Sequence, residues 1–292
     1  MQEEEEFIEE ITKPIEEIDE TFNDKNTHEK KVHKSSKTIE PKVKNLYIQL
    51  GKILRSFQGG KLPAAVNALA TQKNITYWLD LLYLTQPFKW TINALTSVTL
   101  TFQHYASVKR NTIYNEQILL EYVLDRLESP RPIPKTIMEP ITIAARTPQS
   151  FLVGFLIPLS TETICPSKTA KFISTLIAQI KLPNTYANVF IDHLCKSDRS
   201  QVITLFLSRL ISRSYALTIS SIDAIYAYFL SYQGDSEQMP MIWHNAILEF
   251  VQKYGKNLLD EQKEGLTELV KTKSNPKITP QIIELLSQQT NE

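Results

Sequence analysis

Apolar residues recur at helical spacing along most of this 292-residue chain, and prolines stand between the apolar groups. In one such group, Val202, Phe206 and Leu210 are four residues apart, which places their side chains on one face of a helix. Proline is tolerated in the first turn of a helix but not in its interior. The prolines between groups therefore predict helix boundaries, at Pro63, Pro87, Pro130, Pro148, Pro166, Pro183, Pro240 and Pro276.

Signals for other folds are scarce. Only seven glycines are present, which is few for an α/β enzyme whose loops must hold a nucleotide. No Asn-Gly or Asp-Gly hairpin signal occurs. The segment Thr96 to Phe102 is rich enough in Thr and Val for a strand, although Leu95, Val98 and Phe102 also fit one helix face. We predict an all-α protein, built as an irregular, HEAT-like helical-repeat array without a fixed consensus.

Charge is unevenly distributed, although the formal net charge is zero. Met1 to Asp24 holds eleven acidic residues and one lysine, and a Lys-rich stretch follows up to Lys44. Such opposite blocks of charge are typical of a solvated tail. We predict a disordered charged tail over residues 1–44 and a single helical domain over residues 45–292.

The acidic stretch has a second possible behaviour, in which it becomes a helix on a partner. Its apolar residues have a spacing that allows this. They are Phe7, Ile8, Ile11, Ile15 and Ile18.

The first helix of the predicted domain follows the tail and should end at Gly59-Gly60, since glycine commonly stops a helix. One face of this helix is expected to be apolar. Its residues are Leu46, Leu50, Ile53, Leu54 and Phe57.

The chain after Asp24 carries a net charge of +10, because the acidic stretch holds −10. A basic body is compatible with binding nucleic acid or an acidic protein, and it does not choose between them. Lys and Arg on helix surfaces can contact RNA phosphates without a local sequence motif, although many such residues are simply solvated. The candidates are Lys61, Lys89, Lys109, Arg110, Lys168, Lys171, Arg209 and Arg213.

Motifs for catalysis or metal binding are missing from the sequence. Gly59-Gly60-Lys61 lacks the spacing of a P-loop, and neither His-Glu-x-x-His nor paired Cys-x-x-Cys motifs occur. The one tight cluster is Asp192-His193-x-Cys195, which more often reflects a buried cysteine beside a surface histidine than a catalytic pair. We expect no catalytic residue, no metal and no cofactor, with an enzyme using Cys195 and His193 as a distant alternative.

A membrane span and a secreted disulfide framework are also not expected. The longest apolar run, Phe151 to Leu159, is interrupted by Pro158 and is far shorter than the ~20 residues that a spanning helix needs. Two cysteines are too few for a disulfide-rich secreted domain, and glutamates follow Met1 where a secretory signal would be basic and apolar. We expect a soluble intracellular protein with free thiols.

Trp243-His244 invites an active-site interpretation. However, Trp243, Ile247 and Phe250 continue one helical apolar stripe, and such stripes usually lie in the core. We therefore predict that Trp243 has a structural role.

Several distinctive blocks follow one another along this sequence. They are Gly60 to Pro63, Tyr83 to Trp90, Gly154 to Leu159 with Cys165, Tyr215 to Leu217, Ile222 to Ala224, Met239 to His244, and Phe250 to Tyr254. The most distinctive single residues are Trp78, Trp90, Pro158, Pro240, Trp243 and His244. In their order and spacing, these blocks resemble the bystin family of small-ribosomal-subunit assembly factors.

This resemblance implies an all-helical, non-enzymatic protein. Members of the family bind the 18S rRNA precursor in the forming head of the small (40S) subunit, together with small-subunit ribosomal proteins and other pre-40S assembly factors. They move from nucleolus and nucleus to cytoplasm with the particle. On this basis the preferred phosphate contacts are Lys61, Lys89, Lys168 and Arg213.

The chain departs from the family pattern at some basic positions. A basic stretch of the family is Glu121 to Leu124 here, and its paired lysines before Tyr215 are reduced to Arg213-Ser214.

The alternative function is a helical adaptor that binds only proteins and does not contact RNA directly.

Overall fold

The computed structural model describes residues 39–71, 77–161, 166–236 and 238–290, and every regular element in these ranges is a helix. No strand occurs within them, which confirms the all-α prediction. Among the helices of these ranges, none has both the length and the apolar character needed to cross a bilayer. Contacts divide the chain into two compact units, Met1–Leu159 and Ser160–Glu292, and each is described by itself.

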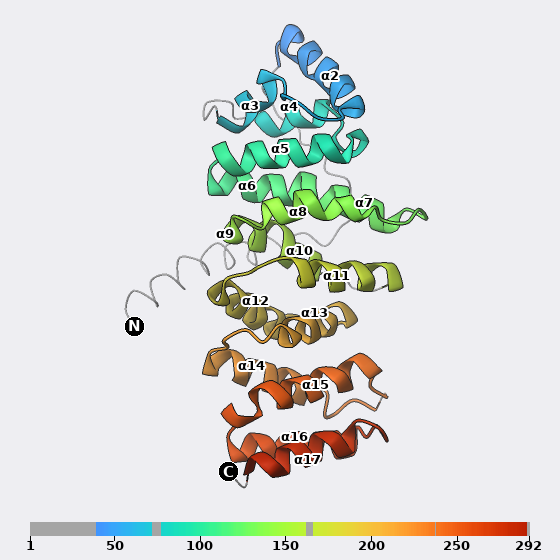
Figure 1. Ribbon diagram of the computed structural model, residues 1–292, viewed down its shortest axis with the longest axis vertical. Coiled ribbons are helices and arrows are strands. Elements are labelled where there is room, and N and C mark those ends of the chain that lie inside the picture. The colour runs from blue at the N-terminus through green and yellow to red at the C-terminus, as the bar shows by residue number, and fades with distance from the viewer. Residues whose placement is uncertain (1–38, 72–76, 162–165, 237, 291–292) are drawn as a thin grey trace, which may run out of the picture. The chain divides into compact units, whose positions relative to one another are not determined.

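Unit 1 is built from short helices, three of which lie side by side as α5, α6 and α8 in Figure 1. Helix α2 packs on α4, α3 packs on α5, and α6 packs on α9. The α-helices are α2 (Pro41–Ser56), α3 (Ala64–Thr71), α4 (Trp78–Leu84), α5 (Ile92–Tyr105), α6 (Val108–Tyr114), α7 (Glu121–Glu128), α8 (Met138–Ala144), α9 (Pro148–Phe151) and α10 (Ile157–Ser160), which reaches unit 2. The 3₁₀ helices are η1 (Pro87–Lys89) and η3 (Lys135–Ile137), and the π-helical segments are η2 (Asn115–Leu120) and η4 (Leu152–Leu156).

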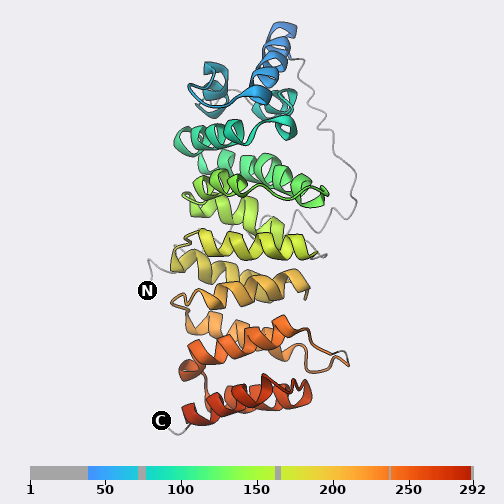
Figure 2. The same cartoon turned by 45° about the vertical axis from the view of Figure 1, so that its right-hand side comes forward.

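Unit 2 has two layers of alternating helices, as Figures 1 and 2 show. In the first layer α11 contacts α13, α13 contacts α15, and α15 contacts α17; in the second, α12 contacts α14 and α14 contacts α16. This order of contacts is what a helical-repeat array produces. The elements are α11 (Ser167–Gln179), α12 (Asn184–Lys196), α13 (Gln201–Ser212), α14 (Ile219–Leu230), α15 (Met241–Tyr254), η5 (Gly255–Asn257), α16 (Asp260–Thr272) and α17 (Thr279–Thr290).

The prolines mark helix boundaries as predicted. Pro148 occupies the first turn of α9, and Pro166, Pro183 and Pro240 directly precede α11, α12 and α15. The ambiguous segment from Thr96 to Phe102 is helical and lies within α5. The helix is favoured over a strand here because it buries one apolar face completely. The residues of this face are Ala94, Leu95, Val98 and Phe102.

The predicted tail ends earlier than expected. Helix α2 begins at Pro41, so residues 41–44 are helical. Proline suits this position because its missing N–H would have no partner in the first helical turn. Residues 1–38 lie outside the described ranges, and the single domain over residues 45–292 stays a prediction.

The apolar face of α2 is only partly the predicted one. Leu50 and Leu54 are buried as expected, but Leu46 and Ile53 are each 51% exposed. Tyr47 and Gly51 complete the buried face. Successive residues of an α-helix are rotated by about 100°, so the buried face formed by Tyr47, Leu50, Gly51 and Leu54 is centred about 100° away from Leu46 and Ile53. This pair therefore lies at the side of the helix, next to the buried face.

The Thr85–Trp90 corner explains why one block of the sequence is so distinctive. Trp90 is 3% exposed, and its indole Nε1 donates to the Thr85 carbonyl oxygen at 3.2 Å. Gln86 has a positive φ of 57°, which turns the chain from α4 into η1. Gly51 of α2 packs so close to the Thr85 carbonyl that a Cβ atom there would overlap it. The corner therefore fixes the position of α2.

A similar close approach joins η4 to α6, and the two π-helical segments also contact each other. A Cβ atom on Gly154 of η4 would overlap the Thr112 carbonyl oxygen of α6. Next to it, Asn115 Nδ2 donates to the Ser150 carbonyl oxygen at 3.1 Å. The block from Gly154 to Pro158 thus lies at a tight crossing of backbones.

Replacing Gly51 should destabilise unit 1. We expect Gly51→Ala to lower the free energy of unfolding by about 1–3 kcal/mol, because the backbone at Thr85 must move to admit the methyl group. Urea unfolding followed by circular dichroism measures this. Gly234→Ala is the matched control, since a Cβ atom there meets no atom within 4 Å; equal losses in both variants would contradict the explanation.

Candidate functional site

The predicted phosphate contacts separate into two groups once their surroundings are known. The arginines donate hydrogen bonds to other parts of the chain, whereas most of the lysines are exposed. Arg110 of α6 illustrates the first group: its Nη1 donates to the carbonyl oxygens of Leu69 at 2.8 Å and Ala70 at 3.3 Å, in the last turn of α3. Its guanidinium also lies over the Trp78 ring, 5.3 Å from the centroid. Partial burial lowers the pKa of Arg110.

Arg213 has the same role in unit 2. It follows the last residue of α13, and its Nη1 and Nη2 donate to the carbonyl oxygens of Ala178 at 2.9 Å and Ile180 at 3.2 Å. These carbonyls are at the end of α11, where a helix carries partial negative charge and lacks internal donors. Arg209, one turn earlier, donates from Nε to Ser174 Oγ at 3.1 Å.

The next helix of the layer repeats this arrangement with Lys253, which the sequence analysis did not single out. Its Nζ donates to the Ile211 carbonyl at 3.1 Å and to the Ser212 carbonyl, at the end of α13. One turn earlier, Glu249 accepts a hydrogen bond from Ser212 Oγ. The pairs Arg209/Arg213 and Glu249/Lys253 therefore hold equivalent positions. The signal in the sequence was a polar pair four residues apart in the last turns of both helices.

A further arginine joins loops at the opposite ends of these helices. Arg199, between α12 and α13, donates to the Ser231 carbonyl at 2.8 Å and forms an ion pair with Asp235 at 2.9 Å. Its guanidinium lies 4.7 Å from the centroid of the Tyr232 ring. Both edges of unit 2 are thus held by cations that bind within the chain.

Four of the predicted lysines form the second group. They are exposed, and their side-chain amines have no hydrogen bond or ion pair among the described residues. They are Lys61, Lys89, Lys109 and Lys171. Lys168 differs, since it is half-buried and is not without a partner.

Within unit 1, the segments that carry Lys61 and Lys89 are joined by hydrogen bonds. Thr91 Oγ1 donates to the Phe57 carbonyl at 2.6 Å, and Asn93 Nδ2 donates to the Gln58 carbonyl at 2.8 Å. Lys109 lies in the first turn of α6, beyond the other end of α5, a 14-residue helix that spans about 21 Å. The structure therefore joins the segments that carry the first two lysines and places the third beyond the far end of α5.

The family fingerprint residues are mainly structural. Trp78, Trp90, Trp243 and His244 are all buried, whereas Pro158 is half-buried and Pro240 is exposed just before α15. The Trp243 ring meets Phe229 edge-on, with centroids 6.0 Å apart. Burial lowers the pKa of His244. The burial of Trp243 and its contact with Phe229 confirm that this residue belongs to the core.

Cys195 lacks the surroundings of a nucleophile. Burial raises the pKa of its thiol, and the negative charge of Asp192 raises it further. A reactive cysteine needs the opposite influence, from a cation or a helix N-terminus. Within the described ranges, no group of three or more His, Cys, Asp or Glu residues could hold a metal ion.

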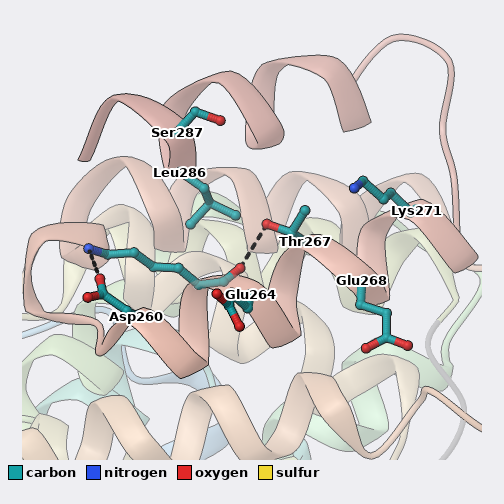
Figure 3. Close-up of a pocket in the computed structure, with 8 residues that line it drawn as sticks. Asp260, Glu264, Thr267, Glu268, Lys271, Leu286 and Ser287 are labelled. Carbon is teal, nitrogen blue, oxygen red and sulfur yellow. Dashed lines mark hydrogen bonds and ion pairs between the residues drawn. The ribbon is translucent and has the colours of Figure 1, made fainter. Parts of the chain in front are cut away.

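A shallow pocket of about 360 Å³ lies between α16 and α17 (Figure 3). Its lining is mostly charged and includes the Lys263 Nζ–Asp260 Oδ1 bond of 3.2 Å. Leu286 contributes from α17. Glu264, Glu268 and Lys271 extend along α16. None of the predicted phosphate contacts lines this pocket.

Comparison with known proteins identifies the family. A family model described as Bystin matches residues 1–292. The chain belongs to the bystin family. It is 27% identical over 253 residues to Bystin of Arabidopsis thaliana, covering 87% of this chain and 56% of that protein. It is 28% identical over 244 residues to Bystin of Monosiga brevicollis, covering 84% of this chain and 58% of that protein. It is 26% identical over 244 residues to Bystin of Homo sapiens, covering 84% of this chain and 55% of that protein. This bystin-family chain thus spans little more than half the length of these relatives.

Loss of the cations that bind helix ends should destabilise this bystin-family protein. We expect Lys253→Met to lower the free energy of unfolding by about 1 kcal/mol, because two carbonyls at the end of α13 are then left without a charged donor. Chemical denaturation measures the change. Lys171→Met, at an exposed lysine without such bonds, should have an effect below about 0.5 kcal/mol. A smaller loss of stability in Lys253→Met than in this control would refute the assignment.

Cys195 should react slowly while the protein is folded. In a Cys165→Ser background, we expect alkylation by iodoacetamide at pH 8 to be at least roughly tenfold slower than in urea, because the raised pKa keeps the thiol protonated. Above the pH at which an unfolded cysteine ionises, the folded state retains the proton and loses stability as pH rises. Native reactivity equal to that of the unfolded chain would show that the thiol is accessible and ionised.

Proposed function

We propose that this protein is a non-catalytic assembly factor of the small (40S) ribosomal subunit. It binds the 18S rRNA precursor and proteins in the forming head of the subunit, and it supports rRNA processing and maturation. The observation that carries this proposal is the match of the bystin family model to residues 1–292. The mode of action is occupancy: a helical surface holds immature RNA and partner proteins in place without changing a covalent bond.

The exposed lysines supply the chemistry for binding RNA. An ammonium group on a flexible stem can follow a phosphate without a fixed geometry. Lys61 and Lys89 are the strongest candidates, since their segments are hydrogen-bonded together and neither charge is used within the described ranges. Arg110 and Arg213 are weaker candidates, because the carbonyls of α3 and α11 already occupy their guanidinium groups.

The partners and locations follow from the same proposal. Small-subunit ribosomal proteins and other pre-40S factors would share the particle with this protein, which would move with it from nucleolus and nucleus to cytoplasm. The raised pKa of Cys195 supports a role without nucleophilic catalysis. No step in the proposed action requires a metal or a cofactor.

A protein-binding adaptor is the second candidate, and exposed apolar residues favour it. Ile219 at the start of α14 is 77% exposed, and Leu259, just before α16, is 65% exposed. Gln262 Nε2 donates to Asp223 Oδ1 at 2.7 Å, which joins these two ends. Exposed apolar side chains on adjacent helix ends are typical of a protein contact rather than a phosphate contact.

Removal of the exposed lysine charges should flatten the salt dependence of RNA binding. The variant carries Lys61→Gln, Lys89→Gln, Lys109→Gln and Lys171→Gln. For a single-stranded fragment, each lysine that no longer neutralises a phosphate should reduce the slope of log K against log salt by about 0.7. Fluorescence anisotropy with small-subunit rRNA fragments at several salt concentrations measures the slope, and circular dichroism verifies folding. An unchanged slope would contradict binding by these lysines.

Ultraviolet crosslinking in cells separates the two functions. The assembly factor should yield crosslinks to small-subunit rRNA, reduced in the lysine variant. Crosslinks confined to partner proteins, together with loss of partner binding in Ile219→Gln/Leu259→Gln, would favour the adaptor.

A further inference from the structure

Helix α2 has an apolar flank that no described residue covers. Leu46 and Ile53 are each 51% exposed, although the next face of the same helix is buried against α4. They are seven residues apart, so two helical turns place them side by side. Figures 1 and 2 show α2 at the end of unit 1, with its neighbours in that unit on one side.

The surroundings of this flank are positively charged. Lys42 and Lys52 are exposed, and α2 contains no acidic residue in its sequence PKVKNLYIQLGKILRS. On a helical projection, both lysines lie on the exposed side of the pair Leu46 and Ile53. The matching partner therefore has an apolar stripe bordered by carboxylates.

A segment of the same chain has this chemistry. Met1 to Asp24 carries a net charge of −10, the most acidic block in the sequence. Within it, Phe7, Ile11, Ile15 and Ile18 recur every three or four residues with glutamates beside them, and Pro14 between them excludes one continuous helix. We propose that residues 7–18 dock on the Leu46/Ile53 flank of α2 in the same molecule, with their carboxylates facing Lys42 and Lys52.

The length of the intervening chain permits this contact. Residues 19–40 join the two segments, and a random coil of 22 residues would span about 25 Å on average. Helix α2, with 16 residues, is about 24 Å long. The connection therefore reaches any point along α2 and gives a high effective concentration, so that a modest contact suffices.

Zero-length carbodiimide crosslinking of the full chain at low protein concentration tests the proposal. The product joins the Lys52 amine to a glutamate of residues 3–17 and is mapped by mass spectrometry. Lys52 is the reporter because lysines nearer the tail would react merely through proximity in sequence. We expect a Lys52 crosslink in the wild-type protein, and a roughly tenfold lower yield in Leu46→Gln/Ile53→Gln, which removes two aliphatic groups from the contact.

The matched control is Ile48→Gln. Ile48 is also exposed, at 38%, but lies on a different side of α2, so its replacement should leave the yield unchanged. Ile11→Gln/Ile15→Gln should reduce the yield as the α2 double variant does. Because all α2 positions changed are exposed, thermal unfolding should be nearly unaffected.

Several results would overturn the proposal. These are no Lys52 crosslink in the wild type, no effect of Leu46→Gln/Ile53→Gln, or an equal effect of Ile48→Gln. In a mixture of ¹⁴N- and ¹⁵N-labelled protein, crosslinks between differently labelled chains would show a second copy as the occupant and would also overturn it. No RNA is present in the experiment, so its outcome is independent of the proposed RNA binding.

Discussion

The last turn of a helix leaves backbone carbonyls without donors in that helix, and a stack of short helices has many such ends. In unit 2, Arg213 and Lys253 supply donors to the ends of α11 and α13, each from the following helix of the same layer. In unit 1, Arg110 does so for α3. The packing of neighbouring helices and the neutralisation of their ends are therefore achieved by the same side chains. This requirement determines which basic residues remain available to a ligand.

Much of the architecture could be predicted because it depends on local chemistry. Proline constrains its own φ and removes a donor, so Pro148, Pro166 and Pro240 indicate helix starts without knowledge of the fold. The buried face of α13 followed from the spacing of Val202, Phe206 and Leu210. The π-helical segments could not be predicted, since the close contact of Gly154 with Thr112 depends on residues distant in sequence.

The candidate site was less predictable than the fold. Sequence identifies a positive charge but not the group that the charge meets, so Arg213 and Lys171 were both candidate phosphate contacts, and Arg213 was the preferred one. The structure separates them, because Arg213 reaches two carbonyls and Lys171 is exposed. The flank of α2 shows the same limit: Leu46 and Leu50 share an apolar stripe, but only contacts with α4 decide which of them is buried.

The cations that bind within the chain and those that remain exposed also differ in chemical type. The guanidinium groups of Arg110, Arg199 and Arg213 hold helix ends and loops, whereas many lysine amines are exposed, and Lys253 and Lys263 are among the exceptions. Acylation acts on amines and leaves guanidinium groups unchanged. Acetylation of this protein would thus remove surface charge while leaving most of its internal cation contacts in place.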